Sequence, residues 1–394
     1  MARELLTGNY AAGHVLGLAG EANRFGRGAI CGAYPIKPQT EIVEHLREFE
    51  FTKGRVVPVE SEHSAMAVCM GGSLAGARSF TASSSNGLAY MTENIFAAGY
   101  YRLPIVLIGV NRTLGPPWNI WADQGDTLMM RDAAWLQFYT ESHQDLVDTI
   151  LLAFRVCEDH RILLPAIVAE DGFIVSHTQM VVDIPSQEQV DRYLKPLDLP
   201  HRLRDKGMTI GGMTFPRETE QHRREIQAAM ERVPAVLAEA LDEFEKVFGR
   251  RPHGLLSAEH TEDADAILVA CNTMVRTARG VVKSRRARGQ KVGLIKARLF
   301  RPFPREAFAT AVGRAKRVGV LDRNHSPGSG GIFWQEIAAS LRPPHKKNGA
   351  EVLLQDYLVG LGGGDVTPAI IEEILDDLLA RKMAGEPVWK EAPL

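Results

Sequence analysis

Short apolar runs alternate with helical segments over the first 176 residues or so. The runs that resemble buried strands are GAICGAYPI, RVVPVE, ARSFTASSS, LPIVLIGVN and LLPAIVAEDGF. Between them lie Ala- and Gly-rich or amphipathic segments that we expect to be helices, such as GNYAAGHVLGLAGEA, NGLAYMTENIFAAGYY and DLVDTILLAFRVCEDH. Strands that alternate with helices form a parallel sheet covered on both faces. The first part of the chain is therefore predicted to be a doubly wound α/β domain.

A second α/β series follows, in which the strands DAILVACN, KVGLIKARLF, RVGVLDRN and EVLLQDYLVGLGGG are separated by helices. The segment from about 181 to 250 differs. It opens as an irregular, Pro-rich stretch and continues as a charged helix, ETEQHRREIQAAMERVPAVLAEALDEFEKVFG. Acid–base pairs at helical spacing are typical of a solvated or subunit-facing helix. We therefore expect two doubly wound domains, 1–250 with a connecting segment from about 181, and 251–394.

Composition narrows the class of protein. The chain has 46 Lys and Arg against 48 Asp and Glu, a balance that argues against nucleic acid as the main partner. No apolar run reaches membrane-spanning length and no signal peptide is evident, so we expect no membrane partner and a cytoplasmic location. The four widely spaced cysteines cannot by themselves hold an iron–sulfur cluster or a structural zinc.

Three glycine clusters differ from nucleotide-binding loops. GLAGEANRFGRG is not G-x-G-x-x-G after a strand, and no G-x-x-x-x-G-K-[ST] occurs. The clusters at 328–331 and 360–364 follow strands but lack the acidic partner of a dinucleotide fingerprint. We therefore interpret both as tight turns, and we expect the second domain to be structural.

The stretch Val59–Gly87 carries the strongest chemical signal. It places Glu62 at the start of a helix of small residues, ahead of a strand that ends in serines. A helix start offers free N–H groups and a positive dipole end, and small residues permit close approach by a cofactor ring or a backbone. Glu62 is either a buried proton relay facing a cofactor or a glutamate that only complements the dipole, and the local sequence favours neither. Ser61 and His63 are expected to be capping or surface residues.

Two strand ends carry basic residues. Lys37 follows the first strand, where open parallel sheets bind ligands, and its flanking prolines would aim its ammonium, although an exposed loop lysine is commoner. Arg112 follows LPIVLIGV and offers a planar fork for a carboxylate. The loop after it contains Trp118, Asn119, Trp121 and Asp123. This aromatic density favours a pocket wall or a subunit interface equally.

Several motifs occur in a characteristic order: YPIKP, VESEHSA, GARSFTASSSNGL, NRTLGPPWNIWADQGD, and KARLFRPFP with VLDRN. Together they resemble the α subunit of the thiamine-diphosphate-dependent 2-oxoacid:ferredoxin oxidoreductases, the pyruvate:ferredoxin oxidoreductase superfamily, over nearly the whole chain. The resemblance implies a pyrimidine-type thiamine domain followed by a domain like the C-terminal domain of transketolase. It also implies an oxidoreductase that decarboxylates a 2-oxoacid.

The resemblance implies roles for individual residues. Glu62 matches the glutamate that faces the aminopyrimidine ring, favours its imino tautomer and so helps to deprotonate the thiazolium carbon. Arg112 matches the arginine that pairs with the substrate carboxylate, and Lys37 stands where the family usually has threonine. The other residues of the expected site are Tyr34, Pro35 and Ser84 toward the cofactor, and Trp118 and Asn119 toward the substrate.

The resemblance also bears on substrate and partners. The substrate we expect first is an aryl 2-oxoacid such as phenylglyoxylate, because of Trp118 and Trp121. Oxalate or a dicarboxylic 2-oxoacid comes next, because of Lys37, and pyruvate is a further alternative. A β subunit would bind the thiamine diphosphate with its Mg²⁺, γ and ferredoxin-like δ subunits would carry iron–sulfur clusters that this chain lacks, and coenzyme A would take the acyl group. A transketolase- or decarboxylase-type subunit that transfers no electrons is the alternative activity.

Overall fold

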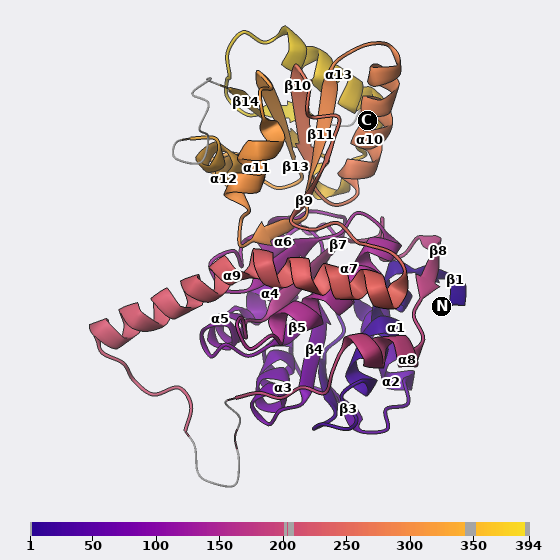
Figure 1. The fold of residues 1–394 in the computed structure, drawn as a ribbon, viewed down its shortest axis with the longest axis vertical. Coiled ribbons are helices and arrows are strands. Elements are labelled where there is room, and N and C mark those ends of the chain that lie inside the picture. Colours follow the sequence, from indigo (N-terminus) through magenta and orange to yellow (C-terminus); the bar gives the residue numbers. More distant parts are fainter. Residues whose placement is uncertain (1, 201–202, 204–208, 343–351, 391–394) are drawn as a thin grey trace.

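The computed structural model describes residues 2–200, 203, 209–342 and 352–390. They form two α/β units, each a mostly parallel sheet with helices on both faces (Figure 1). The first sheet has seven strands in the order β12-β6-β7-β5-β4-β2-β3, and the second has six in the order β15-β14-β13-β10-β11-β9. The expected fold class is therefore confirmed, while the boundary near residue 250 stays a prediction.

The first unit contains the elements that hold most of the expected site. They are α1 (Gly8–Glu21), β2 (Ala29–Ala33), α2 (Thr40–Glu48), β3 (Gly54–Pro58), α3 (Glu62–Leu74), β4 (Arg78–Ser83), α4 (Ser85–Tyr90), α5 (Thr92–Tyr100), β5 (Ile105–Asn111), α6 (Gly125–Leu128), β6 (Leu136–Tyr139), α7 (His143–Cys157) and β7 (Ala166–Asp171). The segment expected as one helix after β4 is two, because the backbone leaves the helical region at Met91. A separate two-stranded ribbon pairs β1 (Ala2–Thr7) with β8 (Gln179–Ile184).

The central strand β5 shows why helices cover both faces of the first sheet. Its side chains alternate in direction, as in any strand, and all of them are buried. Val106, Ile108 and Val110 belong to the core that α1 and α7 cover. Ile105 and Leu107 belong to the core that α3 and α5 cover. A continuous apolar run is therefore needed at this position.

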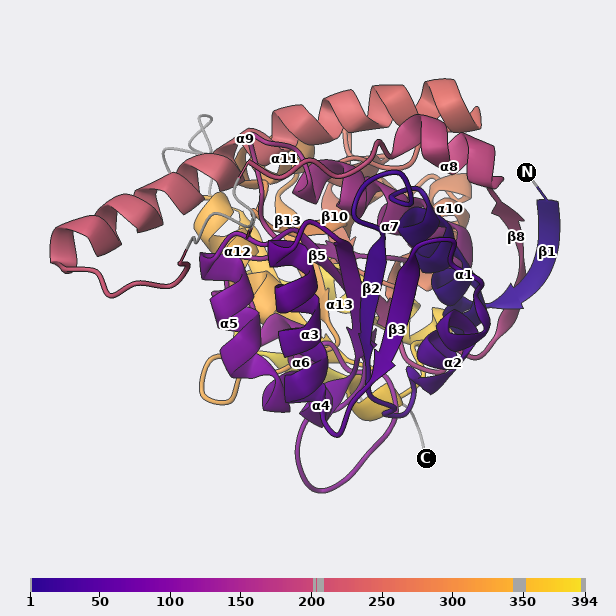
Figure 2. The same ribbon diagram turned by 90° about the horizontal axis from the view of Figure 1, so that it is seen from below.

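Helix α9 (Pro216–Phe248) corrects the expectation of a solvated connecting helix. Between Pro216 and Glu225 no side chain is buried, and this part projects from the body (Figures 1 and 2). From Ile226 onward, apolar residues at helical spacing pack against α7 and α8 (Gln187–Tyr193). They belong to the same hydrophobic core as the buried residues of α1 and α7. The expectation was wrong for this half because the charged residues concealed a regular apolar stripe. Residues 201–202 and 204–208 of the segment expected to be irregular lie outside the described ranges.

The second unit is smaller. Its elements are β9 (Leu256–Glu259), β10 (Ala266–Ala270), α10 (Met274–Ala287), β11 (Val292–Ala297), α11 (Arg305–Val312), β13 (Arg317–Asp322), α12 (Ile332–Ser340), β14 (Leu353–Val359), α13 (Pro368–Ala380) and β15 (Val388–Lys390). The apolar run KVGLIKARLF, expected as one strand, is divided between the two sheets. β11 lies in the second sheet, whereas β12 (Leu299–Arg301) pairs antiparallel with β6 in the first. The two units are therefore joined through a strand as well as through α9.

Buried charges fix the place where the chain passes from β11 to β12. Lys296 Nζ lies 2.6 Å from Asp145 Oδ2 on α7, and Arg298 Nε lies 3.5 Å from Asp145 Oδ1. All three side chains are buried. Burial opposes ionisation of Asp145, but the two cations outweigh it and hold the pKa of this carboxyl well below its ordinary value. The contact attaches the second unit to a core helix of the first.

We expect Lys296→Met to lower the free energy of unfolding by about 3–5 kcal/mol, because it leaves the buried Asp145 carboxylate without its nearest cation. Arg251→Met is the control: its partners among the described residues, Asp242 and Glu245, are exposed, so the variant should leave the free energy of unfolding close to that of the parent. The depressed pKa of Asp145 means that its contribution is present above about pH 4 and is lost as the pH falls further. The difference in free energy of unfolding between the parent and Lys296→Met, measured by urea unfolding, should therefore be smaller at pH 3.5 than at pH 7. Equal losses for both variants would contradict the assignment.

Candidate active site

The carboxyl ends of β2, β4 and β5 lie side by side at one edge of the first sheet. β4 pairs with both of the other strands, and β3 lies on the far side of β2, so the direction of winding reverses between β2 and β4. Ligands of open parallel sheets bind outside the carboxyl ends at such a point. This edge faces the second unit (Figure 1). All of the expected site residues follow these three strands or begin the helix α3.

Glu62 is the first residue of α3. The expected capping role of Ser61 is confirmed, because its hydroxyl accepts a hydrogen bond from the Ser64 amide at 3.2 Å. Glu62 is only 7% exposed, yet within the described ranges its carboxylate has no hydrogen bond and no ion pair. A Cβ atom built on Gly87 would lie 2.7 Å from Glu62 Oε1 and 2.5 Å from Ser83 Oγ. Glycine at this position therefore lets the backbone of α4 approach the buried carboxylate more closely than any other residue would.

The two serines at the end of β4 have different surroundings. The Ser84 hydroxyl, which we expected to face a cofactor, donates to the Val110 carbonyl at 2.7 Å and so joins β4 to β5. The Ser83 hydroxyl, which the sequence did not single out, is buried next to Gly87 and has no partner among the described residues. A buried polar group without a partner is costly. The free hydroxyl at this edge is therefore that of Ser83.

Arg112 and the segment after β2 meet above the sheet. Arg112 Nη1 donates to the Lys37 carbonyl at 2.6 Å, and its Nε is buried without a partner. Burial lowers the pKa of Arg112, although not enough to discharge a guanidinium. The Lys37 ammonium is paired with Glu41 at 2.6 Å instead of pointing freely at the site. Tyr34 is half-buried and Pro35 exposed at the same strand end.

The loop after Arg112 extends toward the second unit. Trp118 is 69% exposed, whereas Asn119 Nδ2 donates to the Gly362 carbonyl of the second unit at 2.9 Å. The Trp121 ring lies 4.7 Å from the Phe173 ring, measured between centroids. Of the two residues of this loop that were expected to face the substrate, Trp118 is therefore exposed and Asn119 is bonded to the second unit.

Asp126 is a residue that sequence reasoning missed. Its buried carboxylate accepts from the Ser85 amide at 2.9 Å and from the Arg112 amide at 3.0 Å, and it also accepts from Asn111 Nδ2 at 2.8 Å. Ser85 has φ of +48°, a conformation that costs a non-glycine residue about 1–3 kcal/mol and needs such support. Burial raises the pKa of Asp126 to about 7. One side chain thus holds the turns after β4 and β5.

A buried polar network continues from Asp126 into the second unit. Asn272 Nδ2 donates to Asn111 Oδ1 at 3.2 Å and to Asp171 Oδ1 at 3.0 Å. Arg323 Nη1 pairs with Asp171 Oδ2 at 3.0 Å, and both side chains are almost wholly buried. Asn111 and Asp171 end strands of the first sheet, while Asn272 and Arg323 follow strands of the second. The carboxyl edges of the two sheets therefore meet through a continuous chain of hydrogen bonds.

Glu170 is a second buried carboxyl without an evident signal in the sequence. It is fully buried at the end of β7, and neither of its oxygens has a partner among the described residues. Burial, with a smaller effect from Asp171, raises the pKa of Glu170 to about 8. Its Oε2 lies 2.6 Å from the place of a Cβ on Gly8, beneath the start of α1. It is neutral at physiological pH.

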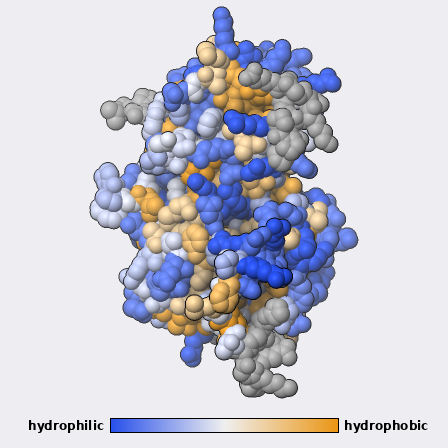
Figure 3. Space-filling model, turned by 90° about the vertical axis from the view of Figure 1, so that its left-hand side faces the viewer, coloured by the Kyte–Doolittle hydropathy of each residue, from blue (hydrophilic) through white to orange (hydrophobic). Residues whose placement is uncertain are grey.

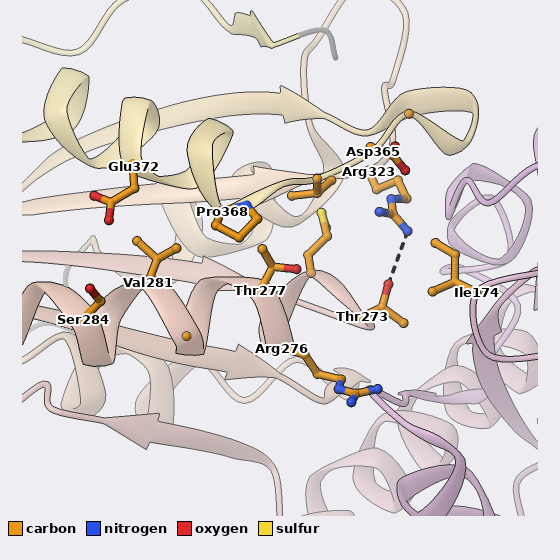
Figure 4. Close-up of a pocket in the computed structure, with 14 residues that line it drawn as sticks. Ile174, Thr273, Arg276, Thr277, Val281, Ser284, Arg323, Asp365, Pro368 and Glu372 are labelled. Carbon is orange, nitrogen blue, oxygen red and sulfur yellow. Dashed lines mark hydrogen bonds between the residues drawn. The ribbon is translucent and has the colours of Figure 1, made fainter. Parts of the chain in front are cut away.

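Two hollows lie away from this edge. One, of about 780 Å³, lies between α10 and α13 and is lined by Thr273, Arg276 and Arg323 among others (Figure 4). The other, of about 1070 Å³, lies between α9 and the segment Arg301–Ala307. Figure 3 shows the side toward which α9 projects, where apolar patches are scattered among hydrophilic ones. Neither hollow includes a residue of the expected site.

Within the described ranges, no helix is both long and apolar enough to cross a membrane.

Two family models match the chain. The model described as pyruvate flavodoxin/ferredoxin oxidoreductase, thiamine diP-bdg, matches residues 24–242, and that described as pyruvate:ferredoxin oxidoreductase core domain II matches residues 264–371. Pyruvate synthase subunit PorA of Methanothermobacter thermautotrophicus is 44% identical over 359 residues, 90% of this chain and 91% of that protein. Ketoisovalerate oxidoreductase subunit VorA of Pyrococcus abyssi is 39% identical over 382 residues, 95% of this chain and 93% of that protein.

Solved structures show the same fold. The 2-oxoglutarate:ferredoxin oxidoreductase from Magnetococcus marinus, with 2-oxoglutarate, coenzyme A and succinyl-CoA bound, has a TM-score of 0.71 at 20% identity. The match covers 95% of this chain and 65% of that one. A split gene transketolase has a TM-score of 0.54 at 15% identity and is matched over 95% of this chain and 98% of its own length. At these identities the likeness concerns the fold alone.

We expect Glu170→Gln to stabilise the protein at alkaline pH. The folded chain holds the Glu170 proton more tightly than the unfolded chain does, so stability from this group is full below about pH 4 and is lost as the pH rises to about 8. Glutamine stays neutral throughout. The melting temperature of the variant should therefore exceed that of the parent only slightly at pH 5 and by several degrees at pH 8.5. Glu231→Gln, on the exposed face of α9, should leave the melting temperature unchanged at both pH values. A Glu170 variant less stable than the parent at pH 8.5 would contradict the assignment.

Proposed function

Because the chain belongs to the pyruvate flavodoxin/ferredoxin oxidoreductase family, we propose that it binds the aminopyrimidine ring of thiamine diphosphate at the strand-end site around Glu62. The chain is the α subunit of a 2-oxoacid:ferredoxin oxidoreductase. One observation carries the proposal: the Glu62 carboxylate is nearly buried at the carboxyl edge of the sheet and has no partner among the described residues. The Ser83 hydroxyl, also without a partner in the described ranges, lies on the other side of Gly87, where any side chain would collide with both groups. A ring with hydrogen-bonding nitrogens would satisfy both groups.

The proposed role of Glu62 is to hold a proton at a ring nitrogen. When bound, thiamine diphosphate supplies a thiazolium carbon that attacks the keto carbon and a ring that accepts the electrons released by decarboxylation. Glu62 would bind the ring nitrogen and stabilise the imino tautomer of the neighbouring amine. Because Glu62 is the first residue of α3, its carboxylate has a fixed direction and lies at the positive end of the helix dipole. Tyr34 and Pro35 would frame the ring at the end of β2, whereas Ser84 would contribute by joining β4 to β5 and not by touching the ring with its hydroxyl.

Arg112 would bind the substrate carboxylate. Its Nη1 is held by the Lys37 carbonyl, and its backbone amide is held by Asp126, so the guanidinium has a fixed position. Among the described residues its buried Nε has no hydrogen-bond partner, so a carboxylate that reached the guanidinium would satisfy this donor. Lys37 would add a second cation at the rim, where Glu41 partly neutralises it. Asn119 would line the substrate side from its anchored position.

The substrate is proposed to be a 2-oxoacid with an apolar side chain. Relatives named as pyruvate synthase and ketoisovalerate oxidoreductase subunits favour a small or branched aliphatic one. The aromatic residues of the loop favour a second candidate, an aryl 2-oxoacid such as phenylglyoxylate. Trp118 is exposed in this loop, and the Trp121 ring packs against the Phe173 ring at a tilt of 56°. The product would be an acyl-CoA.

A composite site is part of the proposal. A β subunit would hold the diphosphate and its Mg²⁺, and γ and ferredoxin-like δ subunits would receive the electrons on iron–sulfur clusters. Large apolar residues exposed near the site edge, Tyr90 of α4 with Leu114 and Ile120 of the loop, offer a surface that such a subunit could cover. Cluster absorbance in the visible spectrum of the native complex is expected, and its absence would favour a thiamine enzyme that transfers no electrons.

Glu62→Gln should lower turnover of the intact complex at least about 100-fold, because amide nitrogen cannot take the place of the proton-holding carboxylate. Subunit assembly should be unchanged. Glu60→Gln is the matched control, since Glu60 lies two residues earlier, is exposed and accepts only from the Ser64 hydroxyl and local backbone. Its activity should equal that of the parent. Parent-like turnover in Glu62→Gln would remove Glu62 from the mechanism.

Lys37→Thr should change the substrate profile more than the stability. The exposed pair with Glu41 is worth only about 0.3–0.5 kcal/mol, whereas a second cation near Arg112 affects every carboxylate substrate according to its charge. The measurement is kcat/KM of the intact complex for pyruvate, 2-ketoisovalerate, phenylglyoxylate and 2-oxoglutarate, with and without coenzyme A. We expect the dicarboxylic 2-oxoglutarate to lose most relative to the others. Identical relative rates would make Lys37 an ordinary loop lysine.

A further inference from the structure

The second unit contacts the expected substrate side through a turn of glycines that follows β14. We call residues 360–363 the glycine turn. Gly360, Gly362 and Gly363 have φ of +69°, +61° and +83°, in the left-handed region that favours glycine. The sequence pattern predicted a tight turn here and no further role. The structure places this turn against the loop that follows Arg112.

Two contacts join the glycine turn to that loop. The Gly362 carbonyl accepts from Asn119 Nδ2 at 2.9 Å, and a Cβ on Gly362 would lie 2.9 Å from the same nitrogen. A Cβ on Gly363 would lie only 2.2 Å from the Cβ of Trp121. Side chains do not approach one another so closely, so any other residue at 363 would displace the turn or Trp121. Both the backbone conformation and the missing side chains are therefore needed for this contact.

The loop transmits its position to the carboxylate-binding residue. The Thr113 amide donates to the Trp121 carbonyl at 3.1 Å, and the Thr113 hydroxyl donates to the Asn119 carbonyl. These two hydrogen bonds connect the start of the loop to its end. The Ser85 hydroxyl donates to the Thr113 carbonyl. Thr113 directly follows Arg112 in the chain. A displacement at Asn119 or Trp121 is therefore expected to reach the guanidinium through a single residue.

The glycine turn is itself supported from both units. Arg323 Nε lies 3.0 Å from the place of a Cβ on Gly360, and Arg323 is anchored to Asp171 of the first unit. Figure 4 shows Arg323 bonded to Thr273 and next to Asp365, at the mouth of the hollow between α10 and α13. Val366 Cγ2 lies 2.6 Å from the same Cβ position. The turn is thus held against the loop by side chains on its other side.

We propose that the glycine turn helps to determine substrate specificity. By its contacts with Asn119 and Trp121, the turn sets the distance between the loop that carries them and Arg112, and it is the contribution of the second unit to the 2-oxoacid site. The proposal rests on the proposed function of Arg112 as the group that binds the substrate carboxylate. Trp121 and Asn119 form the contact, and the glycines act as positioning residues without touching substrate. The second unit therefore affects which substrate side chains the site accepts.

The test compares Gly363→Ala with Gly364→Ala in the intact complex. Gly364 is the matched control because it has φ of −54° and its nearest neighbour would lie 3.5 Å from a new Cβ. The measurements are kcat and KM for pyruvate, 2-ketoisovalerate and phenylglyoxylate, together with the melting temperature. Gly363→Ala should change the ratios of kcat/KM between substrates by about tenfold, mainly through KM, as a displacement of one methyl group in a pocket does. Gly364→Ala should leave the ratios within about twofold of those of the parent.

Val366→Ala provides a second variant if Gly363→Ala yields no assembled complex. It removes the support behind Gly360 without creating a clash, and the ratios should move by a smaller factor. Parent-like ratios in an assembled variant, or an equal loss for all three substrates, would overturn the proposal and leave the turn a structural feature. A parent complex that turns over none of the 2-oxoacids would overturn the proposed function as well. The two failures are therefore distinguishable.

Discussion

The buried hydrogen-bonded network between the two sheets is the constraint on which the rest of the site depends. Asp126 binds the amides of both site turns, Asn111 connects it to Asn272, and the Asp171–Arg323 ion pair completes the connection. In a low-dielectric interior, removing one member of such a network leaves the buried polar group that it contacted unsatisfied, which is costly. The strand ends and the placement of the two units are therefore determined together.

Polar groups without partners at the site edge lie where ligands are expected. Ser84 is engaged with the neighbouring strand, and Lys37 is paired with Glu41. The carboxylate of Glu62, the hydroxyl of Ser83 and Nε of Arg112 have no partner among the described residues. Preorganised groups of this kind do not have to be reoriented when a ligand binds. Their arrangement separates a cofactor side, at β4 and α3, from a substrate side, at β5 and the loop.

The sequence predicted what depends on local pattern. Alternating strands and helices identified the fold class, and a carboxylate at the start of a small-residue helix identified Glu62. Contacts between distant segments were not visible in the same way. Asp126 reads as an ordinary acidic residue at a helix start, since its amide partners, Ser85 and Arg112, lie far from it in the chain, at the start of α4 and just after β5. KVGLIKARLF reads as one strand, because nothing local indicates that it crosses between sheets at the buried Arg298.

The position of the thiamine ring relative to Glu62 tests the account most directly. The measurement is a crystal structure of the assembled complex with thiamine diphosphate and a 2-oxoacid analogue that cannot lose its carboxyl group. The account predicts a Glu62 carboxylate oxygen about 2.7–3.2 Å from a nitrogen of the aminopyrimidine ring, with the analogue carboxylate on Arg112. A ring bound by another residue, with Glu62 directed to solvent or to its own helix, would contradict it.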